Sequence, residues 1–197
     1  MRATLGQVRT AVSISQLQRP SFVASIREQL AIYGAAMGAS PDDLPTRQVI
    51  MERHAGYPGL RSLAAFDEQS RQMVAFAYGF HGCTGQWWHD VVWSAVAARS
   101  GSDAAHGWLD DAIEVAEVHV LPEFQARGIG RQLVQDLARD RSERTAVLST
   151  RDAATPARRL YGSLGFSDLL TAFSFPGGGP PYAVMGAVLP LTGSDAG

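Results

Sequence analysis

Residues Gln125-Ala126-Arg127-Gly128-Ile129-Gly130 decide the fold, because they join the end of an apolar strand to the start of an amphipathic helix. The preceding run, residues 113–120, has strand character, and Pro122 ends it because proline has no amide hydrogen for a sheet ladder. Beyond the loop, apolar residues recur with helical spacing at Ile129, Leu133, Val134, Leu137 and Ala138. The hexapeptide is therefore predicted to be a loop that opens a helix.

This loop has the features of an anion-binding site. The first amides of a helix lack intrahelical partners, and the helix dipole places partial positive charge there. Gly128 and Gly130 have no Cβ atom to hold a ligand off the backbone, and Arg127 and Arg131 flank the same opening. A phosphate-bearing ligand is predicted to bind here. The dinucleotide fingerprint is excluded because its leading glycine pair is missing, and the P-loop because the chain contains no lysine.

The segment resembles the pyrophosphate loop of the GNAT superfamily, the acyl-CoA-dependent N-acyltransferases, which has the pattern Q/R-x-x-G-x-G/A. Later in the chain, Ala157-Arg-Arg-Leu-Tyr161-Gly-Ser-Leu-Gly165-Phe166 is similar to the A-x-x-x-Y-x-x-x-G-F helix of the same family. The resemblance implies an α/β (α+β) fold with a mixed, mostly antiparallel sheet of six to seven strands, splayed at its centre, and helices on both faces. It implies acetyl-CoA as acyl donor, no metal, and direct acetyl transfer to a primary amine in a ternary complex.

The resemblance also assigns roles to residues of both motifs. Tyr161 falls where the family keeps the general acid that reprotonates the leaving thiolate. The backbone of the strand end and the loop is expected to bind the cofactor, with the Val118 amide donating to the thioester carbonyl. The cofactor-binding residues implied in this way are Val118, His119, Val120, Gln125, Ala126, Arg127, Gly128, Ile129, Gly130 and Arg131.

The general base has several candidates on the strand before the loop. Glu114 matches, by its offset from the loop, the glutamate used in the histone-acetyltransferase branch, and Glu117 lies closer to the expected acetyl position. We rank Glu117 above Glu114, and His119 or a water relay stays open as an alternative. On a regular strand Glu117 and His119 face one side and Glu114 the other.

A non-catalytic acyl-CoA-binding sensor or interaction module is the alternative function. The asparagine that the family often places seven residues before the tyrosine is Ala154 here, which favours that alternative. The tyrosine and the intact loop glycines favour the enzyme. The acceptor is not identified by the sequence: a small molecule and a peptide are both open.

Composition narrows the class of protein. A net charge of −2 and a pI near 6.2 argue against nucleic-acid binding. The single cysteine, Cys83, excludes an internal disulfide and fits a reducing cytoplasm, where we expect the protein to be soluble. No apolar run reaches the length of a membrane span, so no membrane partner is expected.

The order of expected elements fits one N-acetyltransferase domain over residues 1–192, with a disordered tail at 193–197. Strands are expected at 7–15, 60–66, 72–80, 113–120, 145–150, 167–175 and 182–189, and helices at 21–37, 41–54, 129–139 and from Pro156, capped by Thr155, to Gly165. Residues 82–110 form a Trp-rich insertion, which is expected to pack on the core, to cover the acceptor pocket or to make a homodimer contact.

Overall fold

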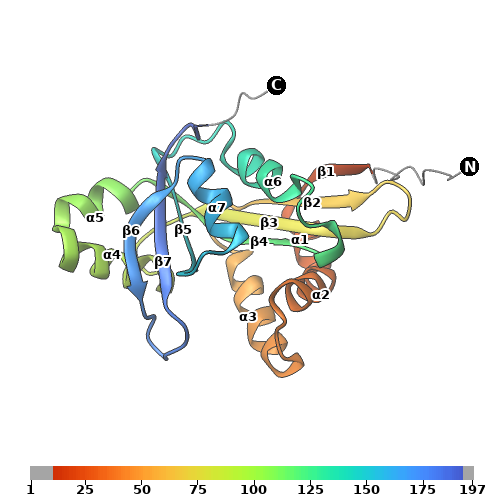
Figure 1. The fold of residues 1–197 in the computed structure, drawn as a ribbon, viewed down its shortest axis with the longest axis horizontal. Helices are drawn as coiled ribbons and strands as arrows, with labels where there is room; N and C mark the ends of the chain where they lie inside the picture. The colour runs from red at the N-terminus through yellow and green to blue at the C-terminus, as the bar shows by residue number, and fades with distance from the viewer. Residues whose placement is uncertain (1–10, 193–197) are drawn as a thin grey trace, which may run out of the picture.

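The computed structural model describes residues 11–192, which form a seven-stranded sheet with helices on both faces (Figure 1). The strands are β1 (Val12–Leu17), β2 (Arg61–Asp67), β3 (Met73–His81), β4 (Ala112–Val120), β5 (Thr145–Arg151), β6 (Ser167–Phe173) and β7 (Tyr182–Val188). The helices are α1 (Arg19–Ala24), α2 (Ile26–Met37), α3 (Leu44–His54), α4 (Trp87–Ser100), α5 (Ser102–Leu109), α6 (Ile129–Ala138) and α7 (Pro156–Ser163), with 3-10 turns η1 (Pro41–Asp43) and η2 (Pro122–Phe124).

The strand order is β1-β2-β3-β4-β5-β7-β6, and β4–β5 is the parallel pair among antiparallel neighbours. This parallel pairing covers Ala112–Glu114 against Thr145–Val147. Both strands then continue, to Val120 and Arg151, without further pairing to each other. The expected mixed sheet, splayed at its centre, is confirmed.

Three apolar clusters hold the layers together. One face carries α6 and α7. Leu133 and Leu137 of α6 are completely buried in the cluster on this face, as is Leu164 directly after α7. On the other face, α1, α2 and α3 cover the β3–β4 half, and α4 and α5 cover the β5–β7 half. Figure 1 shows α4 and α5 at the end of the sheet that carries β6 and β7, with α2 and α3 below β3 and β4. The splay therefore lies between these two helical groups.

The Trp-rich insertion is a pair of helices that packs on the sheet. Val92 and Leu109 are fully buried in one cluster with Val147 and Val184 of the strands beneath. Burying such a side chain contributes about 1.5–3 kcal/mol. Three roles were expected for residues 82–110, and packing on the core is the one that matches this helix pair. Trp87 nevertheless remains 54% exposed.

The first helical segment differs from its prediction. Residues 21–37 were expected to form one helix, but the helix breaks at Ser25 between α1 and α2. The Ser25 hydroxyl donates to the carbonyl of Ser21 at 2.8 Å, and such local bonds compete with helix geometry. Gly38, with φ of 61°, ends α2 in the left-handed conformation. The segment expected as a helix from Pro41 begins as a 3-10 turn.

The structure describes only part of the elements expected at the two ends of the chain. The strand expected at 7–15 is observed as Val12–Leu17, and its residues 7–10 lie outside the described residues, as does the expected tail at 193–197. At the other end, β6 and β7 form the expected closing hairpin. Thr155 caps α7 as expected, because its hydroxyl accepts a hydrogen bond from the Arg158 amide at 3.1 Å.

Candidate active site

The glycine loop connects β4 to α6 in the expected manner. Ala126 and Gly128 both adopt positive φ, 58° and 83°, which bends the chain sharply into the helix. Gln132 donates its amide to the Gly128 carbonyl at 3.0 Å, so the loop amides lie ahead of this intrahelical bond. A Cβ at Gly128 would meet no atom within 4 Å, so this side of the loop is open. The geometry suits an anion at the helix start.

Side chains of the loop fix it to its neighbours. The Gln125 amide nitrogen donates to the Val120 carbonyl at 3.0 Å, which ties the loop to the end of β4. The Arg127 guanidinium donates to the Glu123 carbonyl at 2.6 Å and lies 5.0 Å from the centre of the Phe124 ring. Arg131 donates to the Ser163 hydroxyl at 2.7 Å, which links α6 to α7. Both arginines therefore keep positive charge beside the helix start.

Beyond the paired residues, β4 presents backbone groups toward the splay. The Leu121 amide donates to the Val74 carbonyl on β3 at 2.9 Å. Because successive strand amides point to opposite sides, the amides of Val118 and Val120 point toward β5. These residues are half-buried, whereas Ile113 and Glu114 in the paired part are buried. The separated stretch between β4 and β5, termed the notch, thus has two β4 amides directed toward it.

A bulge in β4 places the acidic residues. Tyr78 pairs with Glu117 and Gly79 pairs with Val115, so Ala116 is an extra residue on β4. A Cβ at Gly79 would lie 2.6 Å from the Glu114 carbonyl oxygen, and only glycine allows this close approach.

The bulge changes which side chains share a face. Val115 and Val118 both pack in the cluster beneath α6, although a regular strand would put them on opposite faces. Glu114, Glu117 and His119 consequently share the face covered by α2 and α3. The expectation that Glu114 faces away from the other two holds only for a regular strand and is wrong here.

Glu117 lies at the centre of a polar cluster on this face. Its Oε1 accepts from Arg47 Nη1 at 2.9 Å, and its Oε2 lies 2.5 Å from His119 Nε2. Arg47 also donates to the Tyr33 hydroxyl at 3.2 Å and lies over that ring. Burial acts to raise the pKa of Glu117, but the hydrogen bond and charge of His119 and the charge of Arg47 outweigh it and lower the pKa.

The pKa of Glu114 is shifted in the opposite direction from that of Glu117. Glu114 is 5% exposed, and its Oε2 has no hydrogen-bond partner. Burial, with the nearby charge of Glu117, raises the pKa of Glu114 to about 8. The bulge therefore places a protonated carboxyl and an ionised carboxylate together at neutral pH.

Tyr161 lies on α7, on the opposite face from Glu117. Its ring packs against Phe166 with centroids 5.8 Å apart, and the residue is 8% exposed. Burial raises the pKa of Tyr161 to about 12, and the charge of Glu117 acts in the same direction. The phenol stays protonated at neutral pH.

The residues that the sequence did not predict come from α2 and α3. Arg47 is separated from Glu117 by a long stretch of chain, and no motif marks Arg47 or Tyr33. The sequence could have pointed to them in only one way: a basic and an aromatic residue lie on helices that the fold places over the strand before the loop.

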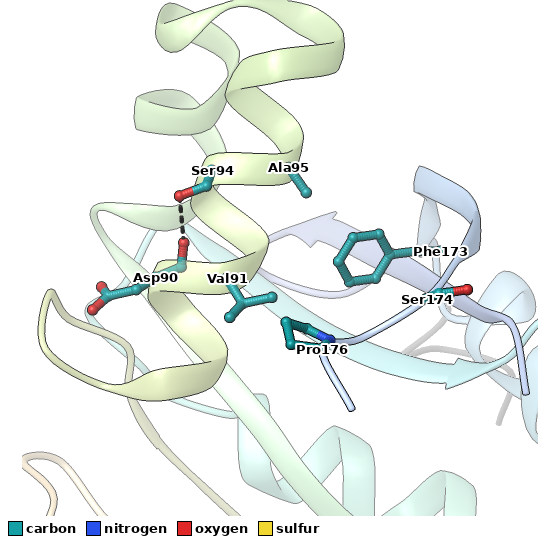
Figure 2. A pocket seen from close by; sticks show the side chains of 7 residues that line it. All are labelled: Asp90, Val91, Ser94, Ala95, Phe173, Ser174 and Pro176. Atoms are coloured by element: carbon teal, nitrogen blue, oxygen red, sulfur yellow. Dashed lines mark hydrogen bonds between the residues drawn. The ribbon is translucent and has the colours of Figure 1, made fainter. Parts of the chain in front are cut away.

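A separate groove lies beside the insertion. It has a volume of ≈ 580 Å³ and is lined by Asp90, Val91, Ser94, Ala95, Phe173, Ser174 and Pro176 (Figure 2). None of the predicted site residues lines it. The insertion approaches the splay elsewhere, where Trp88 Nε1 donates to the Ser149 hydroxyl on β5 at 3.1 Å.

Two kinds of feature are absent from residues 11–192. No helix there is both long and apolar enough to cross a membrane. Within the same residues, no group of three His, Cys, Asp or Glu side chains is placed to hold a metal ion. Cys83 is a half-buried free thiol.

Comparison with known proteins agrees with the geometry. Residues 71–168 match the family model of the acetyltransferase (GNAT) domain. The GCN5-like protein acetyltransferase Rv2170 of Mycobacterium tuberculosis is 35% identical over 133 residues, which are 65% of this chain and 64% of that protein. The chain therefore matches less than two thirds of that relative's length.

Solved structures share the fold. A putative GNAT-family acetyltransferase from Desulfovibrio desulfuricans has a TM-score of 0.63 at 16% identity, covering 90% of this chain and 99% of that one. The putative acetyltransferase yncA from Salmonella typhimurium, solved with its cofactor acetyl-CoA, has a TM-score of 0.59 at 18% identity, covering 91% and 94%. From the family model, the relative and the shared fold together, the chain belongs to the GNAT acetyltransferase superfamily.

Proposed function

We propose that this protein transfers an acetyl group from acetyl-CoA to a primary amine by direct attack in a ternary complex. The observation that carries the proposal is the separation of β4 from β5 beyond Glu114, along a stretch of β4 that runs from Glu117 toward the glycine loop. Family membership supports the same reaction class.

The donor side fits an acyl-CoA. The open loop at the start of α6, with Arg127 and Arg131 beside it, suits the pyrophosphate. The amides of Val118 and Val120 point into the notch, where an extended amide-bearing arm can pair with them. A bound thioester supplies an already activated acyl group, and the Val118 amide donates to its carbonyl oxygen as negative charge develops there.

The acceptor side is the face covered by α2 and α3. This face carries Glu114, Glu117 and His119 of β4, together with Arg47 and Tyr33. One of the three β4 residues takes a proton from the attacking amine. The lowered pKa of Glu117, caused by His119 and Arg47 against the effect of burial, makes its carboxylate a weak base. Tyr161 supplies the proton that the leaving thiolate needs.

Coenzyme A release tests the function. Purified protein and acetyl-CoA are incubated with a panel of amino acids, polyamines, aminoglycosides and short peptides, and free thiol and acetylated product are both measured. Thiol release that depends on one class of amine supports the proposal. Tight CoA binding by calorimetry without release for any amine would instead favour the non-catalytic acyl-CoA-binding module.

A further inference from the structure

Glu117 is held at both of its oxygens. Arg47 Nη1 lies 2.9 Å from Oε1, and His119 Nε2 lies 2.5 Å from Oε2. The side chains of Glu117 and His119 are covered to a similar degree, 8% and 10% exposed, so the engagement of both Glu117 oxygens is what separates the two residues. A carboxylate that already accepts at both oxygens is less free than an imidazole with an open ring nitrogen to take a proton directly from an incoming amine.

The His119 ring is held between two aromatic side chains. Its centroid lies 5.1 Å from that of Tyr33 and 5.4 Å from that of Phe76. With Glu117 accepting at Nε2, the neutral imidazole carries its hydrogen on that nitrogen and has its lone pair on Nδ1. His119 belongs to the part of β4 that has separated from β5, so Nδ1 is a proton acceptor on the separated part of this strand.

We propose that His119 is the general base of the acetyl transfer and that Glu117 is a positioning residue that fixes its ring and tautomer. Arg47 in turn fixes Glu117, and Tyr33 holds both Arg47 and the ring. The inference rests on the proposed function. It departs from the sequence-based ranking, which put the carboxylate of Glu117 first.

The proposed transfer uses one base, His119, and one acid, Tyr161. The amine nitrogen forms a bond to the thioester carbonyl carbon, and its N–H proton passes to Nδ1 of His119. The carbon–sulfur bond breaks, and the thiolate takes the phenolic proton of Tyr161. Glu117 remains a carboxylate and stabilises the imidazolium, as the acidic member of a catalytic triad does. The imidazolium then returns its proton to solvent, and the tyrosinate is reprotonated.

The surroundings of His119 set the expected pH dependence. Glu117 on β4 and Tyr33 on α2 contact the ring directly, and Arg47 on α3 contacts both of them. The other titratable groups around Glu117 are Glu114, His54, Tyr78 and Tyr161. Protonation of the base in the free enzyme makes kcat/KM fall on the acid side of the profile. Removing the negative charge of Glu117 destabilises the imidazolium, so this acid limb moves to lower pH.

The test compares pH–rate profiles of the wild type with those of three variants, using the best amine of the panel. His119→Gln is expected to lose about 10²–10⁴-fold in kcat and to lose the acid limb. Glu117→Gln is expected to keep the limb, shifted to lower pH, with a smaller loss of rate. Glu114→Gln is expected to keep the limb in place. Loss of the limb in Glu114→Gln, together with its retention in His119→Gln, would overturn the assignment in favour of Glu114.

The chain offers a matched control on its surface. His106 and Asp110 on α5 form a similar pair, 2.7 Å apart, but both side chains are about half exposed. His106→Gln and Asp110→Asn are expected to leave the profile unchanged, and CoA affinity shows whether each variant is folded.

A measurement on the free protein separates this inference from the proposed function. Nitrogen-15 NMR of the wild type at neutral pH is expected to show His119 with its hydrogen on Nε2, whether or not an amine has been found. A neutral ring protonated on Nδ1 would overturn the inference alone. No thiol release from the wild type with any amine would overturn the proposed function and, with it, the catalytic role of His119.

Discussion

Tyr161 shows how burial changes the chemistry of a single residue. Burial and the charge of Glu117 raise the pKa of its phenol to about 12, so the proton is secure but harder to release. A free thiolate, with a pKa of about 8.5 for the ordinary thiol, takes that proton only uphill. For the proposed role of Tyr161 as general acid, proton transfer is therefore expected to accompany carbon–sulfur cleavage.

Tyr161→Phe is expected to lower kcat by about 10²–10⁴-fold and to leave CoA affinity unchanged, because the ring and its packing against Phe166 remain. Steady-state kinetics and calorimetry measure the two quantities. Tyr182→Phe is the matched control, since that half-buried ring packs against Phe175 and is not one of the proposed site residues. A loss of less than about threefold at position 161 would assign the acid role elsewhere.

The Glu114 carboxyl is expected to make the free energy of unfolding depend on pH. Its pKa in the folded protein, about 8 because of burial and the charge of Glu117, lies above the ordinary value of 4.5 for a glutamate side chain. Between these values the folded state binds a proton that the unfolded state has released, so stability falls as pH rises, by up to about 1.4 kcal/mol per unit. Below pH 4.5 both states are protonated, and above about 8 both are ionised.

Glu114→Gln removes this titration. Its free energy of unfolding, relative to wild type, is expected to increase steadily from about pH 5 to pH 8 and then to level off. Urea denaturation across this range measures the difference. A difference that is constant with pH would show that the Glu114 carboxyl is not neutral in the folded protein.

At the scale of elements, the loop between β4 and α6 depends on one backbone conformation. Gly128 has φ of 83° and an open side, whereas a Cβ at Gly130 would face Leu160 at 3.5 Å. A valine at position 130 would therefore disturb the contact between α6 and α7 as well as any ligand. Gly128→Asn is the cleaner change, because asparagine tolerates the left-handed region.

Gly128→Asn is expected to weaken CoA binding by about tenfold or more, equal to at least about 1.4 kcal/mol, with a small change in Tm. Gly38→Asn is its control, because Gly38 has a similar φ of 61°, equally open surroundings and no part in the loop. Equal CoA affinity in Gly128→Asn and wild type would remove the pyrophosphate from this loop.

The elements were more predictable than the site. Periodicity and caps located most helices and strands, since Thr155 and Gly38 mark helix ends by local chemistry. The break at Ser25 and the extra residue Ala116 escaped prediction, because they depend on side-chain bonds and on strand register. Arg47 escaped for a related reason: its pairing with Glu117 exists only after α3 packs on β4.

At the scale of the whole molecule, the insertion belongs to the core, and we propose that the chain up to residue 192 is one domain. Leu109 is completely buried with Val147 and Val184, although it lies outside the two sequence motifs. The helix pair thus covers strands that would otherwise expose an apolar face.

Leu109→Ala is expected to lower the free energy of unfolding by about 2–5 kcal/mol while a single transition is kept. Val188→Ala, at a side chain that is 65% exposed, is expected to change it by less than about 0.5 kcal/mol. Circular dichroism follows the fold as a whole, and tryptophan fluorescence follows α4 and α5. Two separated transitions in Leu109→Ala would show that α4 and α5 unfold independently of the sheet.

The separation of β4 from β5 gives this sheet two inner edges as well as its outer ones. An unpaired strand edge attracts other extended chains, including strands of a second molecule. In amide hydrogen exchange, the protons of Val118 and Val120 are expected to exchange quickly and that of His119 slowly, because only the last points toward β3. Coenzyme A should slow the fast pair selectively. We propose on this basis that a bound ligand also blocks these inner edges from pairing with a second molecule.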